Sequence, residues 1–165
     1  MNLSTFITPQ GVIAPLKAAS KKQVLQDLAA AAAATHTGLD ERAIFDTLVE
    51  RERLGSTGVG HGIAIPHGKL ESADKLHGFF ARLAKPVDFD SIDHQPVDLV
   101  FLLIAPSEAG AEHLKALAGI SRLLRDEEIC SKVRGAQNES AVYALLTTED
   151  DKLASFGSRK LPKAS

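Results

Sequence analysis

A run of consecutive apolar residues, Leu99 to Ala105, limits the possible folds more than any other part of this sequence. It reads Leu-Val-Phe-Leu-Leu-Ile-Ala, which is too short to cross a membrane and typical of a buried strand. A strand without a polar face must be covered on both sides. We therefore expect an α/β fold in which helices pack on both faces of a sheet.

Two helices are predicted before this strand. Ser20 and Gln23 form a capping box in front of an apolar stripe, which predicts a helix that continues toward Gly38. Asp40 can cap a second helix, whose apolar stripe ends before Gly55.

Three further strands are predicted in the middle of the chain. Short strands are expected at 63–65 and 87–89, and a longer one at 77–83. The ring of Pro66 holds Ile65 extended, so His67 is expected where a strand ends.

The C-terminal half is predicted to be helical. Apolar stripes at helical spacing recur between residues 114 and 146, and Asn138 is a possible cap for the last helix. The pattern ends near Asp150. We expect residues 1–150 to form one domain and residues 151–165 a polar, frayed tail.

Composition excludes several classes of function. With 165 residues and 44% hydrophobic content, the chain can build a single core, and a net charge of -2 argues against nucleic-acid binding. No segment has the pattern of a signal peptide or a membrane span, so we expect a cytoplasmic protein without membrane insertion. The single cysteine, Cys130, excludes an internal disulfide and reads as a small core residue.

A glycine-rich segment leads to the candidate nucleophile. Gly58, Gly60, Gly62 and Gly68 can let backbone N–H groups approach an oxyanion closely, and they flank His67. An imidazole titrates near neutral pH, and its unprotonated nitrogen is a competent nucleophile. The segment therefore predicts a phosphate site in which His67 attacks.

The same residues allow other interpretations. The segment is not a nucleotide P-loop, because His61 and Gly62 stand where that motif needs Lys and Ser or Thr, and on glycines alone a turn-rich loop is the better interpretation. Six histidines raise the possibility of a metal site, but no pair has the spacing that places two ligands on one helix face. We therefore predict no metal ligands.

His113 has two interpretations that the residues alone leave open. It falls near the start of a predicted helix, where the helix dipole favours a neutral imidazole that can donate through one ring N–H. Its spacing also places it beside Leu114 and Leu117, where it could simply cover the edge of the core.

The run from Arg51 to Leu70 closely resembles the active-site signature of the fructose/mannitol-type enzyme IIA domains of the bacterial phosphoenolpyruvate-dependent phosphotransferase system. It reads RERLGSTGVGHGIAIPHGKL and is most similar to the nitrogen-regulatory branch. The resemblance extends from about residue 3 to residue 146 and includes segments 86–89, 95–99 and 113–117. His61 is a departure, because a small polar residue is expected there.

This resemblance implies a fold and a set of site residues. The fold would be a single domain with a mixed sheet of about five strands sandwiched between helices. His67 would accept a phosphoryl group through Nε2 from the active histidine of a small histidine-phosphocarrier protein, with Arg51 stabilising the phosphate and His113 supporting. Such transfer requires positioning and donors around the phosphoryl oxygens, and it needs no cofactor.

Three functions follow from the resemblance. The first is a regulatory phosphocarrier, whose phosphorylation state controls partners such as transporters or sensor kinases. The second is a sugar-specific enzyme IIA, which passes the phosphoryl group to a cysteine of an enzyme IIB domain in a fructose or mannitol permease. The third is a binding module that keeps the fold without accepting phosphate, which the presence of His67, Arg51 and His113 disfavours.

Overall fold

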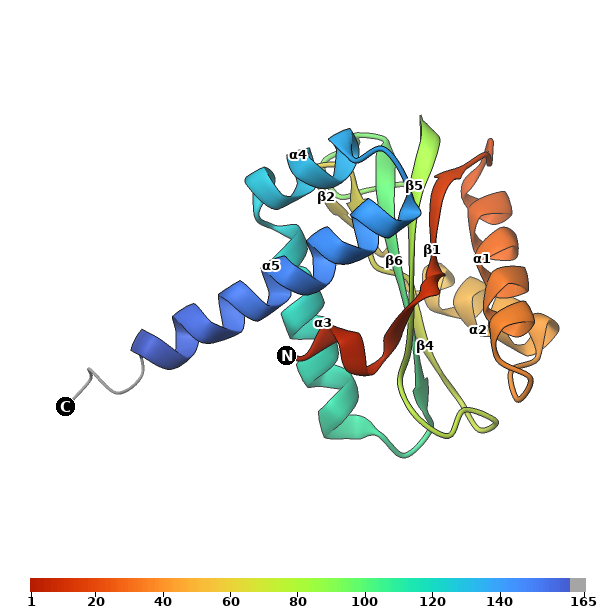
Figure 1. The fold of residues 1–165 in the computed structure, drawn as a ribbon. Coiled ribbons are helices and arrows are strands. Elements are labelled where there is room, and N and C mark those ends of the chain that lie inside the picture. Colours follow the sequence, from red (N-terminus) through yellow and green to blue (C-terminus); the bar gives the residue numbers. More distant parts are fainter. Residues whose placement is uncertain (161–165) are drawn as a thin grey trace.

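A six-stranded mixed sheet forms the centre of the molecule, in a computed structural model that describes residues 1–160 (Figure 1). The strands are β1 (Ile7–Leu16), β2 (Gly58–Gly60), β3 (Ile63–Ala64), β4 (His67–Leu70), β5 (His77–Val87) and β6 (Val97–Pro106). The helices are a short 3-10 helix η1 (Leu3–Thr5), α1 (Lys21–Thr35), α2 (Glu41–Arg53), α3 (Gly110–Leu124), α4 (Glu127–Gly135) and α5 (Glu139–Lys160).

Strand β6 occupies the middle of this sheet. The strand order is β1-β5-β6-β3-β2, and β4 also pairs with β6. β5 is antiparallel to β6 and parallel to β1, whereas β3 and β4 are both parallel to β6. β3 pairs with residues 99–100 and β4 with residues 103–106, so the two follow one another along the same edge of β6.

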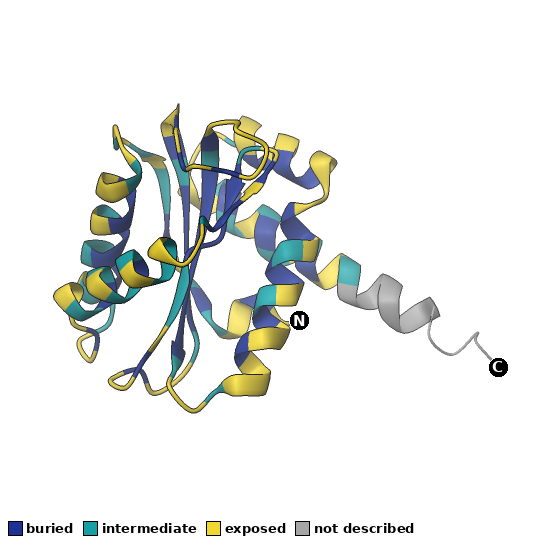
Figure 2. Ribbon diagram, turned by 180° about the vertical axis from the view of Figure 1, so that it is seen from behind, coloured by how far each residue is buried: buried dark blue, intermediate teal, exposed yellow. Residues whose placement is uncertain are grey.

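Helices cover both faces of the sheet, as the apolar run predicts (Figure 1). Val100, Leu102 and Ile104 of β6 pack into a core with α1 and α2, and the alternate residues Leu99 and Phe101 pack into a second core with α3, α4 and α5. Figure 2 shows that the helices turn buried residues toward the sheet and exposed residues outward. The α/β sandwich is confirmed, with six strands where the resemblance implied about five.

The helix caps form as predicted. Ser20 Oγ accepts from the backbone N–H of Gln23 at 3.1 Å, while the Gln23 side chain accepts from the backbone N–H of Ala19 at 3.1 Å. Asp40 caps α2 by accepting from a backbone N–H at 2.8 Å, and Asn138 does the same before α5 at 2.9 Å. These bonds satisfy backbone donors that a helix start leaves without partners.

Several elements differ from the prediction. His67 was expected where a strand ends, but β3 already ends at Ala64 and His67 begins β4; neither β4 nor β2 was predicted. The helix predicted to continue toward Gly38 ends at Thr35, and residues 87–89 form no separate strand because β5 already extends to Val87. The edge strand β1 was not predicted. α5 continues to Lys160, so residues 151–160 are helical where a frayed tail was expected, and the rest of that tail, residues 161–165, lies outside the described residues.

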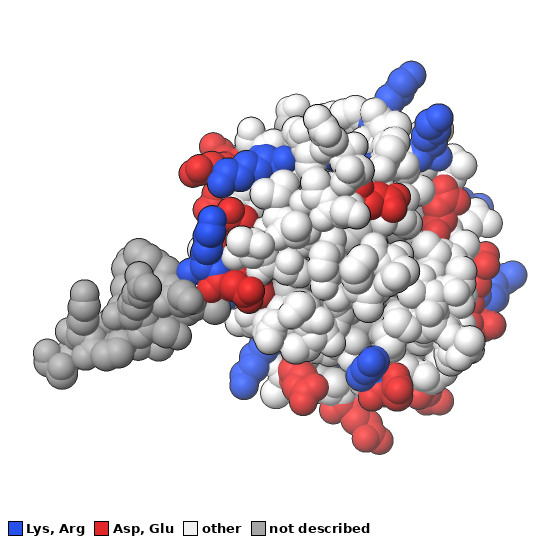
Figure 3. Space-filling view, in the orientation of Figure 1, with Lys and Arg blue, Asp and Glu red and all other residues white. Residues whose placement is uncertain are grey.

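The charge distribution on the surface and the character of the helices can be compared with the expectations about nucleic-acid binding and membrane insertion. On the face shown in Figure 3, basic and acidic side chains are interspersed around an uncharged centre, so this face offers no concentrated basic surface. Within residues 1–160, no helix combines the length and apolar character needed to cross a membrane.

A histidine pair outside the predicted site should make stability depend on pH. The ring centroids of His36 and His77 lie 4.2 Å apart. Burial lowers the pKa of both residues, while the charge of Lys75 opposes their protonation and that of Asp74 favours it. Because each folded-state pKa lies below the ordinary value of 6.5, the unfolded chain takes up protons first as pH falls. The free energy of unfolding should therefore decrease as pH falls through 6.5.

Urea unfolding of a His36→Gln/His77→Gln variant across this pH range checks the prediction. The variant should lose less stability than the parent protein, and the exposed His94→Gln serves as its control. An unchanged pH dependence in the double variant would show that this pair does not contribute.

Candidate active site

The structure brings Arg51, His67 and His113 together at an edge of the sheet. Arg51 lies in the last turn of α2, His67 is the first residue of β4, and His113 lies near the start of α3. α2 packs on one face of the sheet and α3 on the other, so the two helices reach His67 from opposite sides. The three residues therefore form one site although they are far apart in sequence.

The His67 ring is fixed through both nitrogens. Nδ1 lies 2.8 Å from the carbonyl oxygen of Ile65, which can only accept, so Nδ1 carries a proton and donates it. Nε2 accepts from Nε of Arg51 at 3.3 Å. In the neutral ring, Nε2 therefore holds the free electron pair. The residue as a whole is half-buried, so the ring is held in place without being fully enclosed by the protein.

The local environment favours the neutral form of His67. Burial is the largest influence and lowers its pKa, and the positive charge of Arg51 lowers it further. The hydrogen bond to Ile65 and the negative charge of Glu52 act in the opposite direction. A histidine with a lowered pKa keeps an unprotonated nitrogen at neutral pH, which is the form that can act as a nucleophile.

Two bonds orient the Arg51 guanidinium. Nε donates to His67, and Nη1 donates to the carbonyl oxygen of Gly55 at 2.8 Å. Gly55 follows the helix with a φ of 151° and lies in the loop of residues 54–57. The sequence analysis did not identify this carbonyl as a group that orients Arg51. A glycine directly after a helix is typical of a helix C-terminus and was the one feature that could have indicated it.

His113 is a neighbour of His67 rather than only a residue at the core edge. Its ring centroid lies 5.6 Å from that of His67, and the residue is 7% exposed. Burial lowers its pKa, followed by the charges of His67 and Lys69. Within the described part of the chain, its buried Nε2 has no hydrogen-bond partner. An orphaned polar atom beside His67 fits a group that binds an incoming ligand.

Two of the predicted phosphate-loop glycines lie away from this site. Gly60 ends β2 with a φ of 99°, and Gly62 lies in the turn between β2 and β3 with a φ of 81°. A Cβ at Gly62 would meet the side chains of Arg134 and Asp98. The register along β6 separates this turn from His67 by four residues, or about 13 Å. The geometry thus gives Gly60 and Gly62 a role in the turn and does not bring them to the imidazole.

The other two predicted glycines allow close packing. A Cβ at Gly58 would collide with the side chain of Ser91, and a Cβ at Gly68 would lie 2.5 Å from Cγ2 of Thr47 on α2. Thr47 is one helical turn before Arg51. Gly68 therefore lets α2 approach β4 closely enough for Arg51 to reach His67.

Replacing Gly68 by Ala should move the guanidinium away from the imidazole. The added methyl overlaps Cγ2 of Thr47, and overpacking of this kind costs about 1–3 kcal/mol of stability. The resemblance implies phosphorylation by a phosphohistidine donor, and we expect that reaction to slow about tenfold in the variant, because phosphoryl transfer depends on precise positioning of the reacting groups. Adding Thr47→Ala should restore the rate, and a double variant as slow as Gly68→Ala would contradict this explanation.

The remaining histidines do not join the site. His61 is exposed, has a φ of 57° and belongs to the turn between β2 and β3, where its backbone N–H donates to Asp93 at 2.9 Å. His94 lies in the loop after β5. Among the described residues, no three His, Cys, Asp or Glu side chains are grouped closely enough to hold a metal ion.

Comparisons with known proteins identify the family of this chain. Residues 5–149 match the family described as "Phosphoenolpyruvate-dependent sugar phosphotransferase system, EIIA 2". A nitrogen regulatory protein of Bradyrhizobium diazoefficiens is 55% identical over 146 residues, which are 88% of this chain and 95% of that protein. A nitrogen regulatory protein of Klebsiella oxytoca is 39% identical over 149 residues, 89% of this chain and 91% of that protein.

A solved structure gives the same result. The crystal structure of the nitrogen regulatory protein IIA-Ntr from Neisseria meningitidis superimposes with a TM-score of 0.83 at 30% identity, covering 88% of this chain and 99% of that one. The chain therefore belongs to the EIIA 2 family of the phosphoenolpyruvate-dependent phosphotransferase system, in its nitrogen regulatory branch.

Proposed function

We propose that this protein is a cytoplasmic histidine phosphocarrier that accepts a phosphoryl group on Nε2 of His67 and regulates other proteins through its phosphorylation state. The observation that carries this proposal is the unprotonated Nε2, held by Arg51 in a ring that neighbours His113, whose own Nε2 has no partner among the described residues. The donor would be the phosphohistidine of a small histidine-phosphocarrier protein, as the family implies.

The site's residues suit phosphoryl transfer. As Nε2 of His67 approaches phosphorus, the new N–P bond forms while the bond to the donor's imidazole nitrogen breaks, and that imidazole leaves with the electron pair. Arg51 can turn its N–H groups from Nε2 to the phosphoryl oxygens, because Nε already lies 3.3 Å from the attacking atom. His113 can donate from its buried Nε2 when that nitrogen carries the proton.

Phosphorylation would alter the surface that partners contact. It adds nearly two negative charges and new acceptor oxygens. Two exposed apolar residues adjoin the site in sequence: Leu54, which is 86% exposed, follows α2, and Leu114, 68% exposed, follows His113. A partner that packs on these residues and reaches His67 would meet a different charge in each state. Transporters and sensor kinases remain the expected classes of partner.

A transfer assay tests the proposal against the sugar-specific alternative. The protein is incubated with phosphoenolpyruvate, enzyme I and a histidine-phosphocarrier protein, and then with enzyme IIB domains of the fructose and mannitol types. We expect an acid-labile, base-stable label that stays on this protein. The absence of label would refute the phosphocarrier, and rapid transfer to a IIB cysteine would favour the sugar-specific enzyme IIA.

A further inference from the structure

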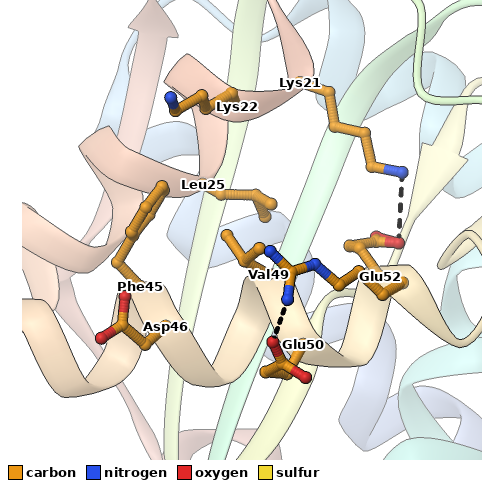
Figure 4. Close-up of a pocket in the computed structure, with 9 residues that line it drawn as sticks. Lys21, Lys22, Leu25, Phe45, Asp46, Val49, Glu50 and Glu52 are labelled. Atoms are coloured by element: carbon orange, nitrogen blue, oxygen red, sulfur yellow. Dashed lines mark hydrogen bonds and ion pairs between the residues drawn. The ribbon is translucent and has the colours of Figure 1, made fainter.

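Beside the site, Glu52 joins α2 to the loop that follows it. Its carboxylate accepts from the backbone N–H of Thr57 at 2.9 and 3.1 Å and from the Thr57 hydroxyl. Lys21 reaches across from α1 and lies 3.3 Å from the same carboxylate, as Figure 4 shows. The Glu52 side chain is only 7% exposed, so this charge is buried together with its partners.

The Lys21 side chain is itself held from several directions. Its ammonium lies 3.4 Å from the backbone carbonyl oxygen of Phe89 and 5.2 Å from the centroid of the Phe89 ring. It stands at one end of a groove of about 800 Å³ between α1 and α2, which continues past Leu25 and Phe45 (Figure 4). The ion pair with Glu52 therefore fixes the end of α2 that carries Arg51.

From Thr57, a chain of hydrogen bonds leads to His67. The Thr57 carbonyl oxygen accepts from the backbone N–H of Ile65 at 3.0 Å. The Ile65 carbonyl oxygen accepts from Nδ1 of His67 at 2.8 Å. The group that selects the tautomer of His67 is therefore itself positioned by Thr57, which is 3% exposed.

We propose that Glu52 and Thr57 are positioning residues that hold both functional groups of the site in register. By closing residues 54–57 against α2, they place the Gly55 carbonyl that orients Arg51. Through the Thr57 backbone, they place the Ile65 carbonyl that keeps the proton on Nδ1 of His67. This inference rests on the proposed function, because the tautomer matters only if Nε2 attacks.

Glu52 also sets part of the electrostatic balance at the imidazole. The charged and titratable groups that face His67 are Arg51 and Glu52 from α2 and His113 from α3, and Lys69 of β4 acts on His113. Glu52 offsets the positive charge of Arg51, since the former raises and the latter lowers the pKa of His67. Removing the carboxylate charge should therefore lower that pKa further.

The first test removes the Thr57 hydroxyl and follows the tautomer of His67 by ¹⁵N NMR of the free protein. Thr57→Val should increase the share of rings protonated at Nε2 and slow phosphorylation about tenfold, whereas Thr57→Ser should stay within about twofold of the parent rate. Thr147→Val, on α5, controls for the loss of a threonine hydroxyl. An unchanged tautomer and rate in Thr57→Val would overturn the proposal.

The second test needs no phosphoryl donor and covers the case in which Thr57→Val does not fold. Glu52→Gln keeps an oxygen that can accept from the Thr57 N–H but removes the charge, so an NMR titration should give a lower pKa for His67. Glu50→Gln is the matched control, because Glu50 lies on the same helix, is exposed and pairs with Arg53. An equal pKa of His67 in Glu52→Gln and in the parent would overturn the proposal that the Glu52 charge raises that pKa.

The two proposals can fail separately. If the parent protein takes up no phosphate while the variants change the tautomer and pKa as expected, the proposed function fails and the positioning stands. If the parent is phosphorylated and the variants behave like it in rate, tautomer and pKa, the positioning fails and the phosphocarrier stands.

Discussion

His67→Ala should abolish phosphorylation of this protein by a phosphohistidine donor. No other residue at the site offers a nucleophilic nitrogen held in the same way, because Nε2 of the neighbouring His113 has no hydrogen-bond partner among the described residues. The measurement is transfer of labelled phosphate from phosphoenolpyruvate through enzyme I and the phosphocarrier protein. His94→Ala, which alters an exposed histidine outside the site, should be labelled like the parent.

The variant should remain folded, so that loss of label reports on chemistry. The alanine removes two hydrogen bonds, one to the Ile65 carbonyl and one from Arg51, each worth about 1 kcal/mol. Unfolding of the purified variant provides the check. Label that persists on folded His67→Ala would refute the assignment of the phosphoacceptor.

Arg51→Gln should slow phosphorylation about 100- to 1000-fold, the usual cost of losing one preorganised donor to a developing charge. The guanidinium is the cationic donor bonded directly to the attacking nitrogen, at 3.3 Å, and its second bond, to Gly55, fixes its direction. A Gln amide is neutral and shorter, so it cannot stabilise the phosphoryl oxygens to the same degree.

Arg53→Gln is the matched control for this prediction. Arg53 lies two residues further along the chain, is exposed and pairs with Glu50. Its loss should leave the rate close to that of the parent. Equal rates in Arg51→Gln and Arg53→Gln would mean that the arginine at the site only packs against the imidazole.

The architecture was largely predictable because its signals are local. The apolar run in β6 required two covered faces, and Ser20, Asp40 and Asn138 each cap a helix as their side chains allow. Strand β1 was not predicted because Pro9 and Pro15 interrupt its apolar pattern. β1 is an edge strand, and an edge strand tolerates proline because the backbone N–H groups on its outer side form no hydrogen bonds within the sheet. The continuation of α5 past residue 150 was not predicted, because no strong apolar pattern at helical spacing extends beyond that residue.

The site was predictable only in part, because most of its contacts are non-local. His67, Arg51 and His113 were identified and do meet. Gly60 and Gly62 were grouped with His67 because spacing does not distinguish an anion nest from a tight turn, and the register of β3 and β4 on β6 separates them from it. The bond between Glu52 and Thr57 depends on how the loop folds back, which no periodicity indicates.

The position of phosphorus on the imidazole tests the central claim most directly. NMR of the ¹⁵N-labelled, phosphorylated protein, with detection of the coupling between ³¹P and ¹⁵N, identifies the nitrogen that carries the phosphoryl group. We predict a bond to Nε2 of His67, with the proton retained on Nδ1 opposite the Ile65 carbonyl. Phosphorus on Nδ1, or on any residue other than His67, would contradict the account.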